Sequence, residues 1–70
     1  MSHGLLVGDD VLTPIEREIM LLLLTEKSEK EIAAEVGKAR STTHNYITGI
    51  YRKCGVNGRA GLMAVWLQQQ

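Results

Sequence analysis

Polar side chains recur at helical spacing between positions 41 and 48 of this 70-residue chain, and no acidic residue follows position 35. An amide such as that of Asn45 can pair with two major-groove atoms of adenine, and serine, threonine and histidine side chains can also contact base edges there. The alternative is that this face is only solvated. The pattern favours a hydrogen-bonding, anionic ligand, and the candidate DNA base contacts are Ser41, His44, Asn45 and Thr48.

Basic residues surround the same segment. Residues 1–36 carry eight acids and three bases, whereas residues 37–70 carry five bases and no acid, so the net charge of zero hides two oppositely charged halves. This asymmetry favours an anionic partner over simple attraction between the halves. For each base the alternative is a solubilising charge or an internal pair with an acid of the first helix, and we assign Arg59 to such a structural role. The expected DNA phosphate contacts are Lys30, Lys38, Arg40, Thr42, Arg52 and Lys53.

The residue types give little support for catalysis, metal binding or membrane insertion. The single cysteine, Cys54, excludes an internal disulfide and a cysteine-based zinc site, and it falls on the opposite face of a predicted helix from His44. We therefore expect no catalytic residue, no metal and no cofactor. The longest apolar run, residues 19–24, is far shorter than a membrane span. A cytoplasmic, nucleoid-associated protein that is not an enzyme is the expectation.

Local signals predict the helices that position these residues. Thr13 and Glu16 form a capping box with Pro14 at the first helical position, and a second box begins at Ser28. Gly37 is a left-handed stop after the second helix. Apolar residues at three- and four-residue intervals then predict a third helix ending before a glycine. The expected helices span about 14–25, 28–36, 41–54 and 59–68, the last capped by Asn57 or Gly58.

These elements predict an all-α fold, a compact four-helix bundle containing a helix-turn-helix. The second and third helices are joined by a tight turn, which is the layout whose second helix enters the DNA major groove. We expect residues 1–11 to form an N-terminal arm or linker and residues 12–70 to form the domain.

In order and spacing, the sequence resembles the LuxR-type (GerE-type) DNA-binding domain at the C-terminus of many bacterial response regulators and quorum sensors. The resemblance covers about Leu12 to Leu67. One departure lies after the turn, where Ala39 cannot cap a helix and Ser41 is expected to take over. The matching residues are Leu12-Thr13-Pro14, Glu16-Arg17-Glu18, Lys30-Glu31-Ile32-Ala33, Thr42, Asn45, Ile47, Ile50-Tyr51-Arg52-Lys53, Gly55-Val56 and Arg59.

The resemblance implies sequence-specific binding of double-stranded DNA by a transcriptional regulator, with the third helix in the major groove. It also implies that the fourth helix often mediates dimerisation on two-fold related half-sites. We expect Met63, Val65 and Trp66 at such a homodimer interface. RNA polymerase, or a sensor or receiver domain, is a further candidate partner, and no membrane is implied.

Two other classes of function remain open. One is a protein-interaction module that keeps the helix-turn-helix fold without specific DNA binding, for which Ile15, Leu21 and Leu24 and the apolar fourth helix would be suited. The other is a related helix-turn-helix, such as the promoter-binding domain of a sigma factor. A salt titration on mixed-sequence DNA separates the interaction module from the DNA-binding classes, because phosphate contacts make affinity fall steeply with salt.

Overall fold

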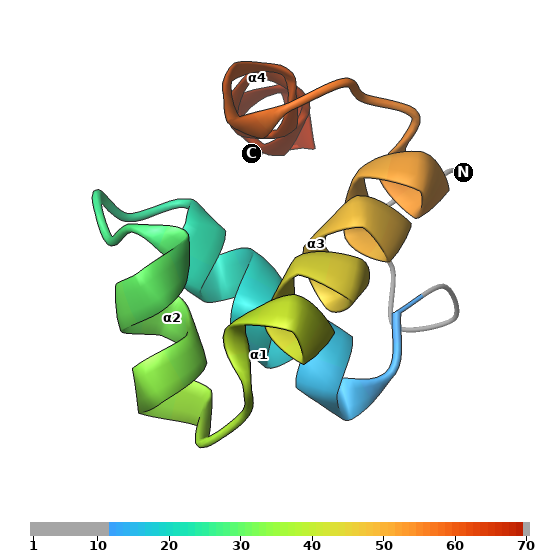
Figure 1. Ribbon diagram of the computed structural model, residues 1–70. Helices are drawn as coiled ribbons and strands as arrows, with labels where there is room; N and C mark the ends of the chain where they lie inside the picture. Colours follow the sequence, from blue (N-terminus) through green and yellow to red (C-terminus); the bar gives the residue numbers. More distant parts are fainter. Residues whose placement is uncertain (1–11, 70) are drawn as a thin grey trace.

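The computed structural model describes residues 12–69, and within this segment the chain forms helices joined by short loops, without a strand (Figure 1). The expected all-α fold is confirmed, while the predicted arm at residues 1–11 lies outside the described residues. None of the helices in the described segment has the length and apolar character that crossing a bilayer requires. The helices are α1 (Pro14–Leu23), α2 (Glu29–Val36), α3 (Arg40–Cys54) and α4 (Arg59–Gln69).

Reciprocal capping boxes fix the starts of α1 and α2, as the sequence predicts. At α1, the Thr13 hydroxyl accepts a hydrogen bond from the Glu16 amide at 3.3 Å, and the Glu16 carboxylate accepts one from the Thr13 amide at 2.9 Å. At α2, Ser28 and Glu31 make the equivalent pair of bonds at 3.2 and 2.7 Å. Each box satisfies amide groups that the first helical turn would otherwise leave without a partner.

Glycines in the left-handed conformation end α2 and α3. Gly37 has φ 73° and Gly55 has φ 71°, a region that disfavours residues with a Cβ atom. After Gly37, the Lys38 amide donates to the Ala33 carbonyl at 3.0 Å, and the Val56 amide makes the corresponding bond after Gly55 at 2.9 Å. These bonds satisfy the last helical carbonyls and reverse the chain within a few residues.

The start of α3 differs from the prediction. The helix begins at Arg40, with Ala39 as the N-cap, so the expectation that Ser41 would cap it is wrong. Ala39 is extended (ψ 154°), and its carbonyl accepts the first helical hydrogen bond from Thr43 at 2.9 Å. The backbone alone therefore supplies the cap geometry, because the reversal after Gly37 is complete by Ala39, and no side chain caps this helix.

α1 ends two residues before its predicted end, and one of the two predicted caps begins α4. α1 was expected to run to Thr25 but stops at Leu23. The Leu24 amide lies 3.2 Å from the carbonyls of both Met20 and Leu21, a tightened last turn that ends the helix. At α4, the Gly58 carbonyl accepts from the Leu62 amide at 3.0 Å, so Gly58 takes the N-cap position.

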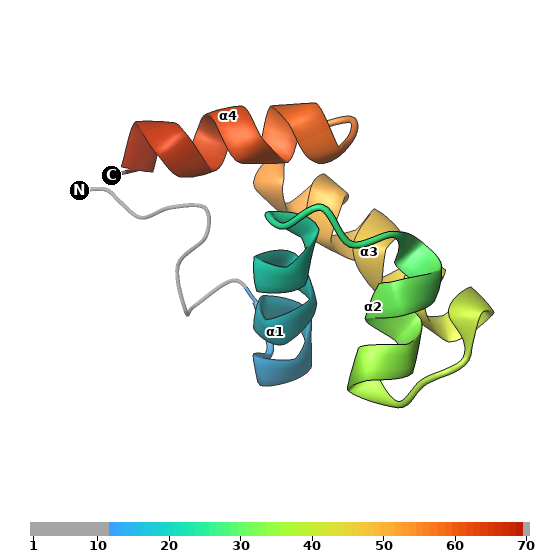
Figure 2. The same ribbon diagram turned by 90° about the vertical axis from the view of Figure 1, so that its left-hand side faces the viewer.

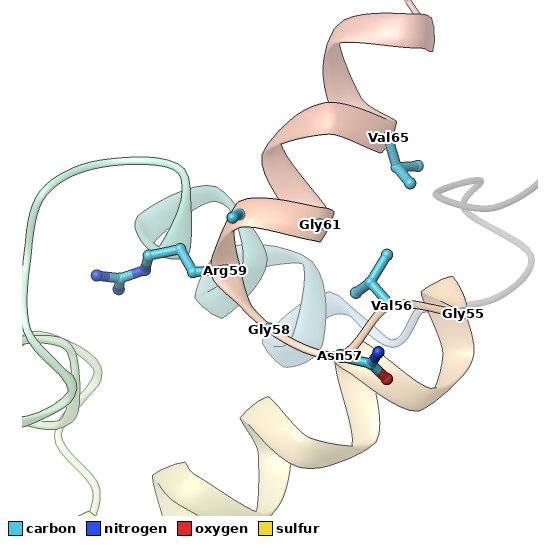
Figure 3. A pocket seen from close by; sticks show the side chains of 8 residues that line it. Gly55, Val56, Asn57, Gly58, Arg59, Gly61 and Val65 are labelled. Carbon is cyan, nitrogen blue, oxygen red and sulfur yellow. The ribbon is translucent and has the colours of Figure 1, made fainter.

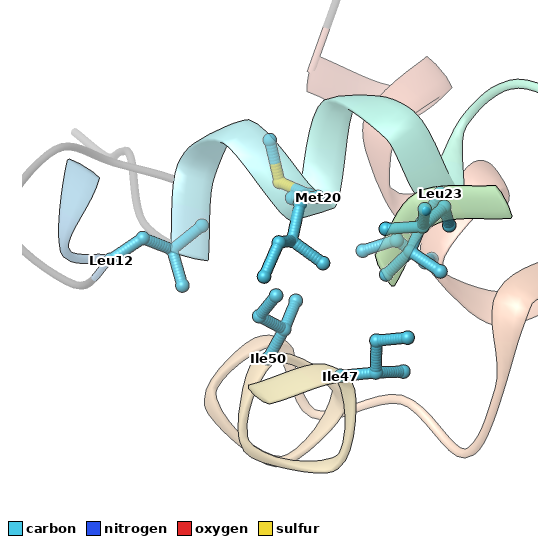
Figure 4. Packing of buried hydrophobic residues seen from close by; sticks show 8 residues of the cluster. Leu12, Met20, Leu23, Ile47 and Ile50 are labelled. Atoms are coloured by element: carbon cyan, nitrogen blue, oxygen red, sulfur yellow. The ribbon is translucent and has the colours of Figure 1, made fainter. Parts of the chain in front are cut away.

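The hydrophobic core lies where α1, α2 and α3 meet. In Figure 4, Ile47 and Ile50 of α3 point toward the face of α1 that carries Met20 and Leu23, with Leu12 at the edge of the cluster. All five side chains are at most 6% exposed. α3 packs against each of the other three helices and is therefore the central element (Figures 1 and 2). This packing determines which face of α3 stays exposed to solvent.

α4 crosses the end of the bundle beyond α3 (Figure 2). Leu62 is fully buried, and Trp66 is partly buried against the core cluster. A Cβ atom on Gly61 would lie 3.1 Å from the Cβ atom of Val56, so the glycine permits the first turn of α4 to approach the α3–α4 loop closely.

Candidate nucleic-acid interface

The side of α3 that faces away from the core carries four exposed polar residues in helical register. They lie at positions i, i+4, i+7 and i+11, which places them on one stripe of the helix. The opposite side of α3, which faces the core, carries the buried residues Thr43, Ile47 and Ile50. α3 contains no acidic residue. We call this stripe the outer face of α3; it consists of Ser41, Asn45, Thr48 and Arg52.

Cationic and hydroxyl groups flank the N-terminal end of this face. Lys30 lies in the first turn of α2, Lys38 in the α2–α3 turn, and Arg40 and Thr42 in the first turn of α3, and all four are exposed. The first turn of α3 itself contains no acidic residue and has no side-chain cap, so its amide groups at the positive end of the helix dipole are not bonded by a capping side chain. This end of the helix-turn-helix therefore suits a negatively charged ligand.

His44 is exposed but does not lie on the outer face. Its Nδ1 atom is 3.2 Å from Oε1 of Glu29, at the start of α2, so the imidazole is turned toward the second helix. The His44 side chain is 62% exposed and that of Glu29 is 44% exposed, so solvent screens the interaction. The contact joins residues 15 positions apart, and no local signal in the sequence indicates it.

Lys53 is bonded within the protein. Its ammonium group donates to Oε1 of Glu16 at 2.7 Å, and the same oxygen accepts the capping bond from the Thr13 amide. Burial works against ionisation of the Glu16 carboxyl, but the hydrogen bonds from Lys53 and Thr13 outweigh it, so the pKa of Glu16 is lowered. The internal pair with an acid of the first helix, which the sequence left as an alternative for the basic residues, is therefore realised at Lys53.

A small hollow separates the start of α1 from α3. It has a volume of about 270 Å³ and is lined by Glu16, Thr42, Asn45 and Tyr46. Asn45, a predicted base contact, thus lies beside the carboxylate that holds Lys53. Apolar side chains do not fill the space on this side of α3.

The predicted dimer residues occupy different surroundings on α4. Met63 and Val65 are half-buried, whereas Trp66 packs partly against the core of its own chain. Figure 3 shows Val65 pointing toward Val56 across a shallow hollow of about 640 Å³. Leu67, which was not predicted at the interface, is 63% exposed.

Arg59 is half-buried at the start of α4, and its side chain points away from Val56 and Val65 (Figure 3). One of its guanidinium nitrogens, Nη2, is buried without a hydrogen-bond partner in the described part of the chain. A guanidinium nitrogen without a partner gives no support for an internal ion pair, and the structural role expected for Arg59 stays a prediction. Of the apolar residues considered for an interaction module, Ile15 and Leu24 pack against the core, while Leu21 is 46% exposed.

Two other potentially reactive side chains among the described residues are Cys54 and Tyr51. Burial, together with the nearby negative charge of Glu16, raises the pKa of the Cys54 thiol, which keeps it protonated and a poor nucleophile. Burial also raises the pKa of Tyr51. Within residues 12–69, no group of three histidine, cysteine, aspartate or glutamate side chains is placed to hold a metal ion.

Comparison with known proteins defines the class of this fold. The family model of GerE, the luxR family of bacterial regulatory proteins, matches residues 10–66. The chain therefore belongs to the luxR family of bacterial regulatory proteins, as the resemblance in its sequence predicts. No solved structure matches the chain.

Three curated relatives are similar to this chain. The probable HTH-type transcriptional regulator GfsR of Streptomyces halstedii is 45% identical over 56 residues, which is 80% of this chain and 23% of GfsR. The spore germination protein GerE of Bacillus subtilis is 42% identical over 50 residues, covering 71% of this chain and 68% of GerE. The transcriptional regulatory protein MctR of Rhizobium johnstonii is 38% identical over 56 residues, covering 80% of this chain and 26% of MctR. The chain thus spans about a quarter of two of these relatives and about two thirds of GerE.

Proposed function

We propose that this chain binds double-stranded DNA in a sequence-specific manner as the DNA-binding domain of a bacterial transcriptional regulator, with α3 in the major groove. The observation that carries the proposal is the outer face of α3, an exposed stripe of hydrogen-bonding and basic side chains on a helix without an acid. A major groove about 12 Å wide admits one α-helix, and the outer face of α3 is not covered by the other three helices. Membership of the luxR family and the similarity to the transcriptional regulators GfsR and MctR support the same class.

The residues take two roles in this proposal. Base contacts come from the outer face and from His44 at its side, with Asn45 as the group best suited to adenine. Lys53 is set apart from the phosphate contacts because its ammonium group is bonded to Glu16. Phosphate contacts position the helix without carrying sequence information. We assign base contacts to Ser41, His44, Asn45 and Thr48, and phosphate contacts to Lys30, Lys38, Arg40, Thr42 and Arg52.

We also propose that two copies meet through α4 on two-fold related half-sites. Met63 and Val65 are half-buried on this helix, and the part of Trp66 not packed on its own core adds apolar surface. One short helix buries far less than the roughly 1,200–2,000 Å² of a stable interface, so DNA must contribute to the association. Sedimentation should show a mainly monomeric free chain and two copies on a selected site. One copy per site at saturation would contradict the dimer.

The function is tested by selecting bound sites from random DNA and then measuring variants on the selected site and on mixed-sequence DNA. Asn45→Ala should lose roughly 1–3 kcal/mol on the selected site and little on mixed sequence, because it removes a base contact. Lys38→Ala should weaken both alike and lower the salt slope by about one, because it removes a phosphate contact. A silent Asn45→Ala on the selected site would show that another face docks.

A further inference from the structure

The ion pair between Glu16 and Lys53 joins the beginning of α1 to the end of α3, residues 37 positions apart. Glu16 has little freedom to move, because its Oε1 atom also accepts the capping hydrogen bond from the Thr13 amide at 2.9 Å. Lys53 is the residue before Cys54, where α3 ends. The pair therefore ties the last turn of α3 to a carboxylate that the N-terminal cap of α1 already holds in place.

Two neighbouring features show how closely the Glu16 carboxylate lies to α3. A Cβ atom at Gly49 would lie 3.9 Å from Oε2 of Glu16, so the carboxylate lies close to the helix with no side chain between them. Toward the start of α3, the hollow beside Glu16, Thr42, Asn45 and Tyr46 leaves the same edge open. The polar contact between Glu16 and Lys53 therefore adds to the apolar packing of Ile47 and Ile50 against α1.

Energetics favour keeping Lys53 on Glu16 when DNA is present. The Glu16 side chain is only 11% exposed, and a carboxylate so buried is costly to leave without its counter-ion. If Lys53 left Glu16 to bind a DNA phosphate, it would only replace one partly screened ion pair with another. Arg52, the preceding residue, is exposed on the outer face and is free of this constraint.

We propose that Glu16 and Lys53 are a positioning pair, which sets the orientation in which α3 presents Asn45 to DNA, and that Lys53 is not a phosphate ligand. This inference rests on the proposed function. A bidentate contact between an amide and a base tolerates little tilt of the helix, whereas a phosphate contact tolerates more. Loss of the pair therefore lowers specific binding more than binding to mixed-sequence DNA.

The test compares Lys53→Met, Glu16→Gln and their double variant with Arg52→Met as a matched control one residue away. Affinity is measured on the selected site and on mixed-sequence DNA over a salt series, at a temperature where every variant is folded. Glutamine is compatible with a capping box, so Glu16→Gln weakens the pair and keeps the α1 cap. Ile19→Val, a conservative change in the core, serves as the control for lowered stability.

Arg52→Met should lower the salt slope by about one and weaken both DNAs alike. Lys53→Met should leave the salt slope unchanged and reduce the ratio of specific to mixed-sequence affinity by roughly threefold to fivefold, the scale of one partly exposed ion pair. Glu16→Gln should reduce that ratio similarly, and the double variant should lose no more than either single one. Ile19→Val should leave the ratio unchanged.

A salt slope lowered by about one in Lys53→Met would overturn the inference, because Lys53 would then be a phosphate ligand. Unchanged specificity in both Lys53→Met and Glu16→Gln would also overturn it, as would an equal loss in Ile19→Val, which would trace the effect to stability. A different result would refute the proposed function: the parent chain would then show no salt-dependent binding to either DNA. The positioning role would be refuted together with it.

Discussion

Thr43 offers a direct test of the packing between α3 and the core. Its side chain faces inward and is 0% exposed, and its hydroxyl oxygen has no hydrogen-bond partner in the described part of the chain. In the unfolded chain the same hydroxyl is hydrogen-bonded to water. Folding therefore removes a polar group from water without replacing its bonds, and Thr43→Val removes this penalty while keeping the branched shape at Cβ.

The expected gain can be bounded from this environment. A buried polar group without a partner costs about 1–3 kcal/mol, and valine and threonine have similar helix propensities. The added methyl group requires slightly more room, which offsets part of the gain. We expect Thr43→Val to raise the free energy of unfolding by about 1–2 kcal/mol, where each 1 kcal/mol corresponds to a rise of about 4–8 °C in Tm for a domain of this size.

Urea and thermal unfolding of the parent and the variant measure this difference. Thr42→Val makes the same chemical change at the neighbouring, exposed position and should alter stability by no more than about 0.5 kcal/mol. Thr43→Ser keeps the hydroxyl and removes the methyl group, so it should destabilise the fold. If Thr43→Val destabilised the protein as much as Thr43→Ser, the hydroxyl would have a partner and the reasoning would be refuted.

Three further predictions concern α3 and its neighbours. Gly49→Ala should stabilise the fold by roughly 0.5–1 kcal/mol, because its Cβ atom meets only Oε2 of Glu16 at an ordinary contact distance; a loss in a urea titration would show that the site is too tight. Because the pKa of Glu16 is lowered from its ordinary value of 4.5, its contribution to stability is present above that pH and is lost as the pH falls through the folded-state pKa; stability measured against pH should be flatter in Glu16→Gln. Glu29→Gln removes a negative charge beside His44 and should strengthen binding to mixed-sequence DNA, most clearly at low salt; an unchanged affinity would place this edge away from the phosphates.

The sequence predicts the helices well because their signals are local. The two capping boxes and the two glycine stops depend on residues within about one turn of each other, and the structure confirms all four as helix boundaries. The error at the start of α3 has the opposite cause. Ala39 lacks a capping side chain, but the turn after Gly37 already gives it the backbone conformation of a cap, which side-chain chemistry alone does not indicate.

The candidate site is less accessible to sequence reasoning, because it depends on how helices cross. Periodicity identifies the exposed stripe of α3, and the structure places Ser41, Asn45, Thr48 and Arg52 on it. It does not indicate that His44 turns toward Glu29 or that Lys53 reaches Glu16, since these contacts join residues 15 and 37 positions apart. The contacts with DNA and with a second copy stay predictions.

The short connections between the helices have a consequence for how fast the domain forms. Each of the three links spans only a few residues, so most contacts join segments close in sequence, and chains of this kind fold in microseconds to milliseconds. The exception is the meeting of α1 with α3, which must close the loop that contains α2. Core residues at this junction, such as Ile19 and Ile47, should therefore slow folding when they are truncated, whereas Leu62 on α4 should mainly speed unfolding.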